Sequence, residues 1–155
     1  MELKKCVVVR KEQVDETLKT PATQGKRLLD PLKTFAQQNW FPVNILEDKE
    51  VSNEAEVHRH EADLWYCIEG EVVFVYGGEM VNPWAKKLPD GGADDREIKA
   101  KEIRNGTEAT LKPGDWLYIP AGQPHLHKTD KTARLFIIKL KEPEVPLEQV
   151  PGWQA

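Results

Sequence analysis

The chain has 155 residues, of which 39% are hydrophobic and 31% are charged, and its formal net charge is -4. This length and composition predict one globular domain with a sizeable core. The interspersed acidic and basic residues argue against nucleic acid or an anionic membrane as the main partner, since both need a concentrated basic face.

The start of the chain and its cysteines bear on the compartment. The N-terminus has an apolar run of only four residues and no cleavage-site pattern, so we expect no secretory signal. No apolar run approaches the length of a membrane span. Cys6 and Cys67 form no CxxC pair, which argues against a disulfide framework or a zinc knot. These features predict a cytoplasmic protein.

Residues 1–39 are expected to form a short strand and one short helix that pack on the main domain. Residues 4–10, KKCVVVR, have the composition of a strand. After a polar connection, residues 30–39, DPLKTFAQQN, predict a helix, because an aspartate cap and a proline at the first helical position precede two apolar residues on one face.

From residue 40 to 141 the pattern is β throughout. Short runs rich in β-branched and aromatic residues alternate with turn residues, and Asn105-Gly106 between two runs predicts a hairpin. Many short strands without alternating helices predict a sandwich or barrel. The runs are WFPVNILE, AEVHRH, DLWYCIE, EVVFVYG, REIKAKEI, EATL, DWLYIP and ARLFIIKL.

Two segments break this rhythm. Residues 83–96, PWAKKLPDGGADDR, are polar and rich in glycine and proline, so we expect a surface loop, with a lid over a pocket as the alternative. Residues 142–155 form a proline-rich C-terminal arm that is expected to pack on the surface as an extended segment.

All four histidines fall into two pairs, His58/His60 and His125/His127. Each pair is spaced i, i+2, which on a strand places both side chains on one face. Two such pairs on neighbouring strands bring imidazoles to one point, and imidazole is a common ligand of zinc, iron, nickel and copper. Asp63 adds an oxygen ligand. This segregation favours a metal site over four unrelated surface histidines.

Residues 113–127, PGDWLYIPAGQPHLH, resemble the second cupin motif, G-x5-P-x-G-x2-H, through Gly114, Pro120, Gly122 and His125. Residues 58–71 are similar to the first motif, H-x-H-x3–4-E-x6-G. The resemblance covers about residues 40–141. It implies an all-β fold, the cupin double-stranded β-helix or jelly-roll barrel, here with a short N-terminal helix.

The same resemblance implies one divalent metal ion (Fe, Zn, Mn or Ni) bound by His58, His60, Asp63 and His125. The chain departs from the family at the carboxylate, because Asp63 stands where the motif has glutamate and only two residues separate it from His60. Glu56, on the same strand face as the histidines, is the alternative oxygen ligand. Asp63 would then hydrogen-bond a histidine instead.

Two further likenesses bear on the substrate. Residues 56–71, EVHRHEADLWYCIEGE, resemble a stretch of the sugar-processing family that includes the β-galactosidase β-subunit, in which His58 and Asp63 would be the important pair. DLWYCIEG, residues 63–70, is also similar to the corresponding strand of 3-hydroxyanthranilate dioxygenases.

Parity along the strands predicts the surroundings of the site. If Asp63 points into the barrel, Trp65 and Cys67 do so as well. Cys67 is expected to be a core residue and not a ligand. Strands such as VVFVY and LFIIKL are apolar on both faces, which predicts that the outer sheet face is covered, in part by a second subunit of a homodimer.

Two classes of function follow. The first is a metal-dependent enzyme that acts on a small polar metabolite, an oxygenase with iron or an isomerase or lyase with zinc or manganese, with His127 and Glu56 as candidate proton carriers. The second is a non-catalytic cupin that binds a small, sugar-like molecule. The fold by itself does not decide between them.

Overall fold

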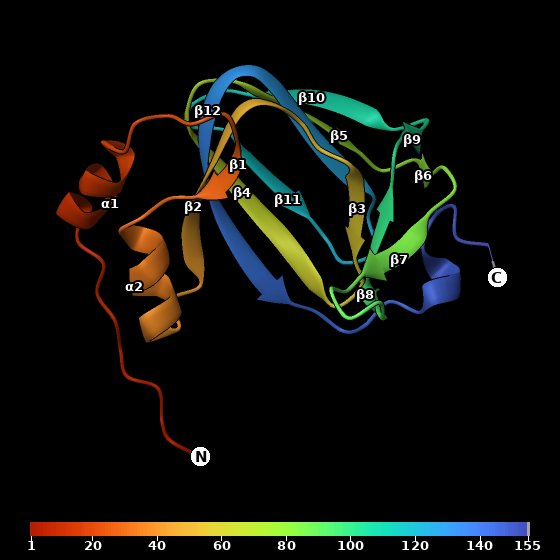
Figure 1. The fold of residues 1–155 in the computed structure, drawn as a ribbon, viewed down its shortest axis with the longest axis horizontal. Helices are drawn as coiled ribbons and strands as arrows, with labels where there is room; N and C mark the ends of the chain where they lie inside the picture. Colours follow the sequence, from red (N-terminus) through yellow and green to blue (C-terminus); the bar gives the residue numbers. More distant parts are fainter. Residues whose placement is uncertain (155) are drawn as a thin grey trace.

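The computed structural model describes residues 1–154 and consists mainly of antiparallel strands with two short helices near the N-terminus (Figure 1). The elements, in chain order, are α1 Lys11–Leu18, β1 Gly25–Leu28, α2 Leu32–Asn39, β2 Val43–Ser52, β3 Ala55–His58, β4 Glu61–Glu69, β5 Val72–Tyr76, β6 Glu79–Met80, β7 Trp84–Lys87, β8 Ala93–Ala100, β9 Ile103–Arg104, β10 Thr107–Leu111, β11 Trp116–Ile119, β12 His125–Lys141 and the 3-10 turn η1 Leu147–Gln149.

The long strand β12 joins two sheet layers into a barrel. Its start pairs with β3 at His125 on one side and with β5 on the other. From Lys128 onward it pairs with β2, and from Arg134 onward it pairs with β4 as well. The register shifts between Thr129 and Thr132, and such an irregularity bends a strand. The predicted jelly-roll barrel is thereby confirmed. β1 and β11 extend one layer, and β8, β7 and β10 extend the other.

The space between the layers is filled by inward-facing apolar side chains. Trp65 and Cys67 are 2% and 0% exposed, which confirms the parity expected for β4. The core cluster comprises Leu46, Trp65, Cys67, Val72, Phe74, Leu111, Ile119, Ala133, Leu135 and Ile137. At one end of the barrel, where β3, β4 and the first residue of β12 meet, polar side chains replace this apolar core.

The N-terminal segment differs from the expectation. The strand predicted over residues 4–10 is absent, and these residues are irregular. The edge of β2 that such a strand could join is already occupied by β1. A helix that was not predicted, α1, follows directly, while the predicted helix is present as α2. Both helices lie beside β1 and β2 at one side of the barrel (Figure 1).

Two turn predictions are also wrong in part. Residues 83–96 are not a loop, because β7 and β8 form a hairpin there; its exposed, charged residues hide the strand pattern. Asn105 has the positive φ of 57° that the turn requires, but β9 and β10 do not pair with each other. β9 instead pairs with β6, and β10 pairs with β5. The turn at Asn105 therefore connects two strands that follow each other along the same side of a two-stranded ribbon.

The C-terminal arm packs on the chain's own barrel. Val150, with Leu147 and Trp153, covers the outer face of β3 and β8. The buried Arg59 donates from Nε to the carbonyl oxygen of Val145 at 2.9 Å. Among residues 1–154, no helix has the length and apolar character that crossing a bilayer requires.

Candidate metal centre

Strand β3 supplies two of the polar residues at this end of the barrel. All four of its residues are buried, because both of its faces are covered. Ala55 and Val57 face the cluster beneath the C-terminal arm, and alternation places Glu56 and His58 on the opposite face, inside the barrel.

The other two residues come from β4 and β12. Asp63 shares the inward parity of Trp65 and is 1% exposed. His125 begins β12 directly opposite Glu56 and is also 1% exposed. The turn before β12 positions His125 relative to His58, because the backbone N–H of Gly122 donates to the carbonyl oxygen of His58 at 2.8 Å. Gly122 has a φ of 83°, a conformation that favours glycine.

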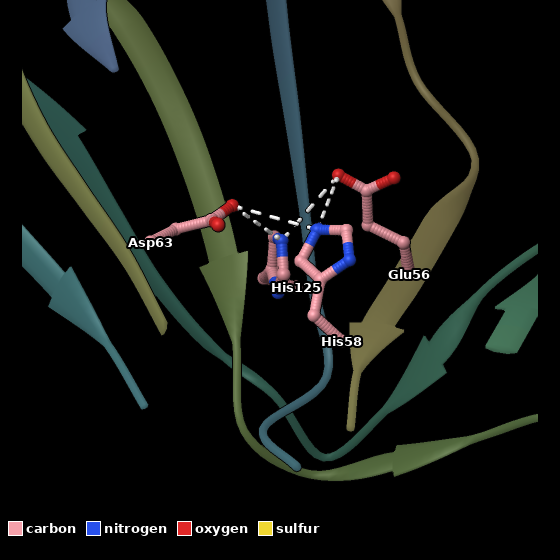
Figure 2. Close-up of side chains that lie close together, drawn as sticks. All are labelled: Glu56, His58, Asp63 and His125. Atoms are coloured by element: carbon pink, nitrogen blue, oxygen red, sulfur yellow. Dashed lines mark ion pairs between the residues drawn. The ribbon is translucent and has the colours of Figure 1, made fainter. Parts of the chain in front are cut away.

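Figure 2 shows the four side chains converging on one point from β3, β4 and β12. One ligand atom from each lies within 4.8 Å of all the others. Nε2 of His125 lies 3.4 Å from Oδ2 of Asp63 and 3.5 Å from Oε1 of Glu56. Nε2 of His58 lies 3.6 Å from each of the same two oxygens. Such separations are those expected between ligands that each lie about 2.1 Å from one ion.

Two of these atoms are buried without a hydrogen-bond partner among the described residues, namely Oδ2 of Asp63 and Nε2 of His125. Buried polar atoms normally have a hydrogen-bond partner. Two buried atoms that lack one and point at the same spot therefore require an explanation. Nδ1 of His125 lies 3.1 Å from the carbonyl oxygen of Gln123, a contact that leaves Nε2 free as a ligand. Two nitrogens and two carboxylate oxygens suit iron, manganese, zinc or nickel.

The protonation of the metal-free cluster follows from these contacts. Burial would raise the pKa of Asp63, but His125 and Lys139 outweigh it and lower that pKa to about 2. Burial would also raise the pKa of Glu56, but His125 and His58 hold it well below the usual value. For His125, burial would lower the pKa, and the two carboxylates instead raise it to about 9. Without metal, the carboxylates are therefore ionised and His125 is protonated.

His60 lies outside this cluster, contrary to the expected ligand set. β3 ends at His58, and residues 59 and 60 form a bend, so strand alternation does not continue to His60. Its side chain is 36% exposed, and its nearest carboxylate is that of Glu61, at 3.9 Å. Glu56 takes the fourth position. The two carboxylates considered as alternatives, Asp63 and Glu56, therefore both point at the same spot.

The second histidine of the other pair is placed deeper in the barrel. His127 is 1% exposed, and its Nδ1 lies 2.5 Å from Oδ2 of the buried Asp48. Its ring is stacked on Phe74 and packs against Trp65. Neither His127 nor Cys67 belongs to the cluster of Figure 2. Burial, with Asp115 and Glu71, raises the pKa of Cys67 to about 11, which makes its thiol a core group.

Two lysines at the cluster were missed by the sequence analysis. Lys139 donates to Oδ1 of Asp63 at 2.5 Å, and Lys99 donates to Oε2 of Glu56 at 2.7 Å. In register, each lysine stands directly opposite the carboxylate that it contacts. The position of Lys139 could have been inferred from strand alternation. Leu135 and Ile137 of β12 face the core, and Lys139, two residues further along, lies on the same face.

The turn G-x5-P-x-G-x2-H and the two strands that carry His58 and Asp63, far from the turn in the sequence, thus meet inside a jelly-roll barrel. The chain has the cupin fold. No protein-family model matches the sequence, and no curated protein matches it.

Among solved structures, the chain is similar to other cupin-fold proteins. The Drosophila melanogaster CENP-C cupin domain is 14% identical over 64% of this chain and 60% of that one, with a TM-score of 0.41. An oxalate oxidase is 16% identical over 86% of this chain and 55% of that one, with a TM-score of 0.45. The protein TT1209 from Thermus thermophilus is 21% identical over 79% of this chain and 81% of that one, with a TM-score of 0.42.

The match thus spans about three fifths of the CENP-C cupin domain and 55% of the oxalate oxidase chain. Such low identities bear on the fold alone and carry no activity to this chain.

Proposed function

We propose that this cupin-fold protein binds one divalent metal ion (Fe, Zn, Mn or Ni) through Glu56, His58, Asp63 and His125, and that it is an enzyme acting on a small polar metabolite. The observation that carries the proposal is the convergence of four buried ligand atoms, two of which have no partner among the described residues. A cation at this point would satisfy both.

The chemistry depends on the ion. Bound there, iron would supply oxygenase chemistry, and zinc, manganese or nickel would supply a Lewis acid for isomerase or lyase chemistry on a hydroxyl or carbonyl group. The chain's own part is to hold the ion with two carboxylates, to fix His125 through Gln123, and to exclude water, since the four residues are 1–8% exposed. Lys139, whose side chain is 41% exposed, lies between the cluster and solvent.

A second candidate, a non-catalytic cupin that binds a small, sugar-like molecule, is favoured by one observation. The two residues expected to carry protons are both engaged elsewhere: Glu56 belongs to the ligand cluster, and His127 is held by Asp48 and by Asn53, whose Nδ2 lies 2.8 Å from the ring. Neither is thus a free base beside a bound ligand.

The test is metal analysis by plasma mass spectrometry on protein expressed without a histidine tag, before and after incubation with each ion. Near-stoichiometric metal supports the proposal, and iron directs the next assay to oxygen uptake. Zinc, manganese or nickel directs it to isomerisation of hydroxy-carbonyl compounds. Protein that holds none of the four ions after incubation overturns the metal site. A metal-loaded protein that binds compounds without turning them over supports the second candidate.

A further inference from the structure

Lys139 connects the cluster with solvent. Its backbone lies opposite Asp63 in the β12–β4 ladder, and its side chain points to the same face as the Asp63 carboxylate. Its Nζ lies 2.5 Å from Oδ1 of Asp63 and 3.0 Å from Nε2 of His58. The ammonium group reaches two of the ligand residues while 41% of the side chain is exposed, so Lys139 extends from solvent to the cluster.

The other lysine at the cluster is bound differently. Nζ of Lys99 is held by Glu56 at 2.7 Å and by Glu97 at 2.9 Å, and only 21% of its side chain is exposed. Two close carboxylates satisfy this ammonium group from within the protein. Lys139 has one close carboxylate, Asp63, while its second, Glu61, lies 3.6 Å away. A metal ion bound to Nε2 of His58 would take the second close partner of Lys139, whose contact with Oδ1 of Asp63 stays in place, and this leaves donors of the ammonium group for a ligand.

The charges around the cluster favour an anion as that ligand. Four carboxylates (Glu56, Glu61, Asp63 and Glu97) face three lysines (Lys86, Lys99 and Lys139) through the contacts of this region. A divalent cation changes this excess of one negative charge into an excess of one positive charge, with both histidines neutral as ligands. In a largely water-excluded site, a positive excess attracts a negatively charged ligand strongly.

We propose that Lys139 is the residue that determines specificity for an anionic ligand, and that the ligand is a small carboxylate with a hydroxyl or carbonyl oxygen on the adjacent carbon. The inference rests on the proposed metal site. One ligand oxygen meets the metal ion, and the carboxylate accepts a charge-assisted hydrogen bond from Nζ of Lys139, which lies within hydrogen-bond distance of two metal-ligating residues.

The experiment uses protein loaded with Co(II), whose d–d absorption reports ligands that enter the coordination sphere. Lactate and its neutral amide, lactamide, are titrated into the wild type, Lys139→Met, Lys139→Arg and Lys141→Met. Lys141→Met is the matched control, because it removes the same charge two residues further along the same strand, where the side chain is exposed. Metal content is measured first in every variant.

We expect the wild type and Lys141→Met to bind lactate at least about tenfold more tightly than lactamide, which is the size of one charge-assisted hydrogen bond. Lys139→Met should lose this preference, and Lys139→Arg should retain part of it. Affinity for Co(II) should not fall in Lys139→Met, because the variant removes a cation that competes for Asp63; this readout separates ligand recognition from a merely structural role.

Either of two results would overturn the inference while leaving the metal site intact. One is an unchanged preference for lactate in Lys139→Met. The other is equal affinity of the wild type for lactate and lactamide, a comparison that decides the matter even where the variant does not fold. Failure of the wild type to bind any ion is a different outcome, detected by metal analysis, and it overturns the proposed function together with this inference.

Discussion

At the scale of single residues, His58 and His60 show how the position of a strand end determines where a side chain points. Both were expected on one face, but β3 ends at His58, so His58 points into the barrel and His60 stays at its rim. Sequence spacing alone carries no information on where a strand ends to within one residue. The side chain of Glu56, two residues earlier on the same strand, completes the cluster instead.

This difference predicts contrasting effects of two alanine substitutions. His125→Ala should lose most of the bound metal, because it removes one of the two imidazoles that point at the site. His60→Ala, the matched control, should keep near-stoichiometric metal. Plasma mass spectrometry after dialysis against a weak chelator measures both. Metal loss in the control would return His60 to the ligand set, and full occupancy in His125→Ala would remove His125 from it.

The protonation of the metal-free cluster predicts a pH dependence. Burial lowers the pKa of His125, but Asp63 and Glu56 raise it to about 9, above the ordinary value of 6.5. The stability that this ion pair gives to the metal-free protein is therefore complete below pH 6.5 and is lost as the pH rises through 9. Metal must displace this proton, so metal affinity should rise over the same interval.

We expect thermal unfolding of the metal-free protein to shift to lower temperature between pH 6.5 and 9, while the increase in melting temperature on adding metal grows. His125→Ala should remove most of both trends. At the acid end, burial raises the pKa of Asp63, but its partners lower it to about 2, so its contribution is present above pH 3.8 and is lost toward pH 2. A metal-induced shift that is independent of pH up to 9 would contradict the protonated state of His125.

At the scale of elements, a buried ion pair ties the N-terminal segment to the barrel. Glu47 of β2 is 0% exposed and accepts from Nε of Arg134 on β12 at 2.8 Å. Arg134 also donates to the carbonyl oxygens of Leu18, the last residue of α1, and of Thr20, which follows the helix. The other oxygen of Glu47 accepts from the backbone N–H of Thr23 and from Arg27. One carboxylate thus fixes three segments of the chain.

Glu47→Gln should lower the free energy of unfolding by roughly 3–5 kcal/mol, the cost of leaving a buried partner charge, here that of Arg134, uncompensated. Urea denaturation measures this loss. Glu71→Gln is the control, since the Glu71 carboxylate is exposed and lies 3.9 Å from the exposed Lys112, so its removal should change stability by less than about 1 kcal/mol. A loss below about 1 kcal/mol in Glu47→Gln would show that Arg134 finds other partners.

The strands of the barrel can be predicted well from the sequence, whereas the peripheral strands cannot. β4 alternates apolar residues that face the core with residues that face outward, and such periodicity is visible without a structure. The hairpin of β7 and β8 carries mainly charged side chains over residues 86–97, and apolar alternation begins only at Ile98 and Ala100, near the end of β8. The run at residues 4–10 has strand composition, but strand formation needs a free sheet edge, which local sequence does not reveal.

The candidate site was predictable to the extent that it depends on local pattern. His58, Asp63 and His125 stand at motif positions, and Glu56 follows from strand parity. Lys99 could not be found in this way, because its contact with Glu56 depends on the pairing of β3 with β8, across 43 residues. Lys139 lies on the inward parity of β12, where a charged residue among apolar ones signals a buried partner.

At the scale of the whole molecule, the outer face of the barrel is only partly covered. The N-terminal helices cover Ile45, Ile68 and Phe136 through side chains such as Leu18, Leu32 and Phe35. The neighbouring part of the face, which we call the outer aromatic patch, remains open and consists of Leu64, Tyr66, Trp116, Tyr118, Ile138 and Leu140. Trp116 is 60% exposed and Tyr118 51%, and the Trp116 ring packs on Tyr66 at a centroid distance of 4.5 Å.

A second copy of the chain is the occupant that we propose for this patch. β11 pairs only with β4 among the described residues, so its other backbone edge is open beside the exposed aromatic rings. An open edge next to an apolar surface favours strand pairing with another chain, and a two-fold axis would bury both copies of the patch at once.

The wild type should therefore elute as a dimer in size-exclusion chromatography with light scattering at micromolar concentration, and Trp116→Glu should elute as a monomer, because it places a charge at the centre of the contact. Trp40→Glu is the matched control: Trp40 is 73% exposed, but it follows α2 and is not one of the residues of the patch, so the dimer should persist. Because the cluster of Figure 2 comes from one chain, both variants should still bind metal. A monomeric wild type, or a dimer that survives in Trp116→Glu, would mean that this face does not join two copies.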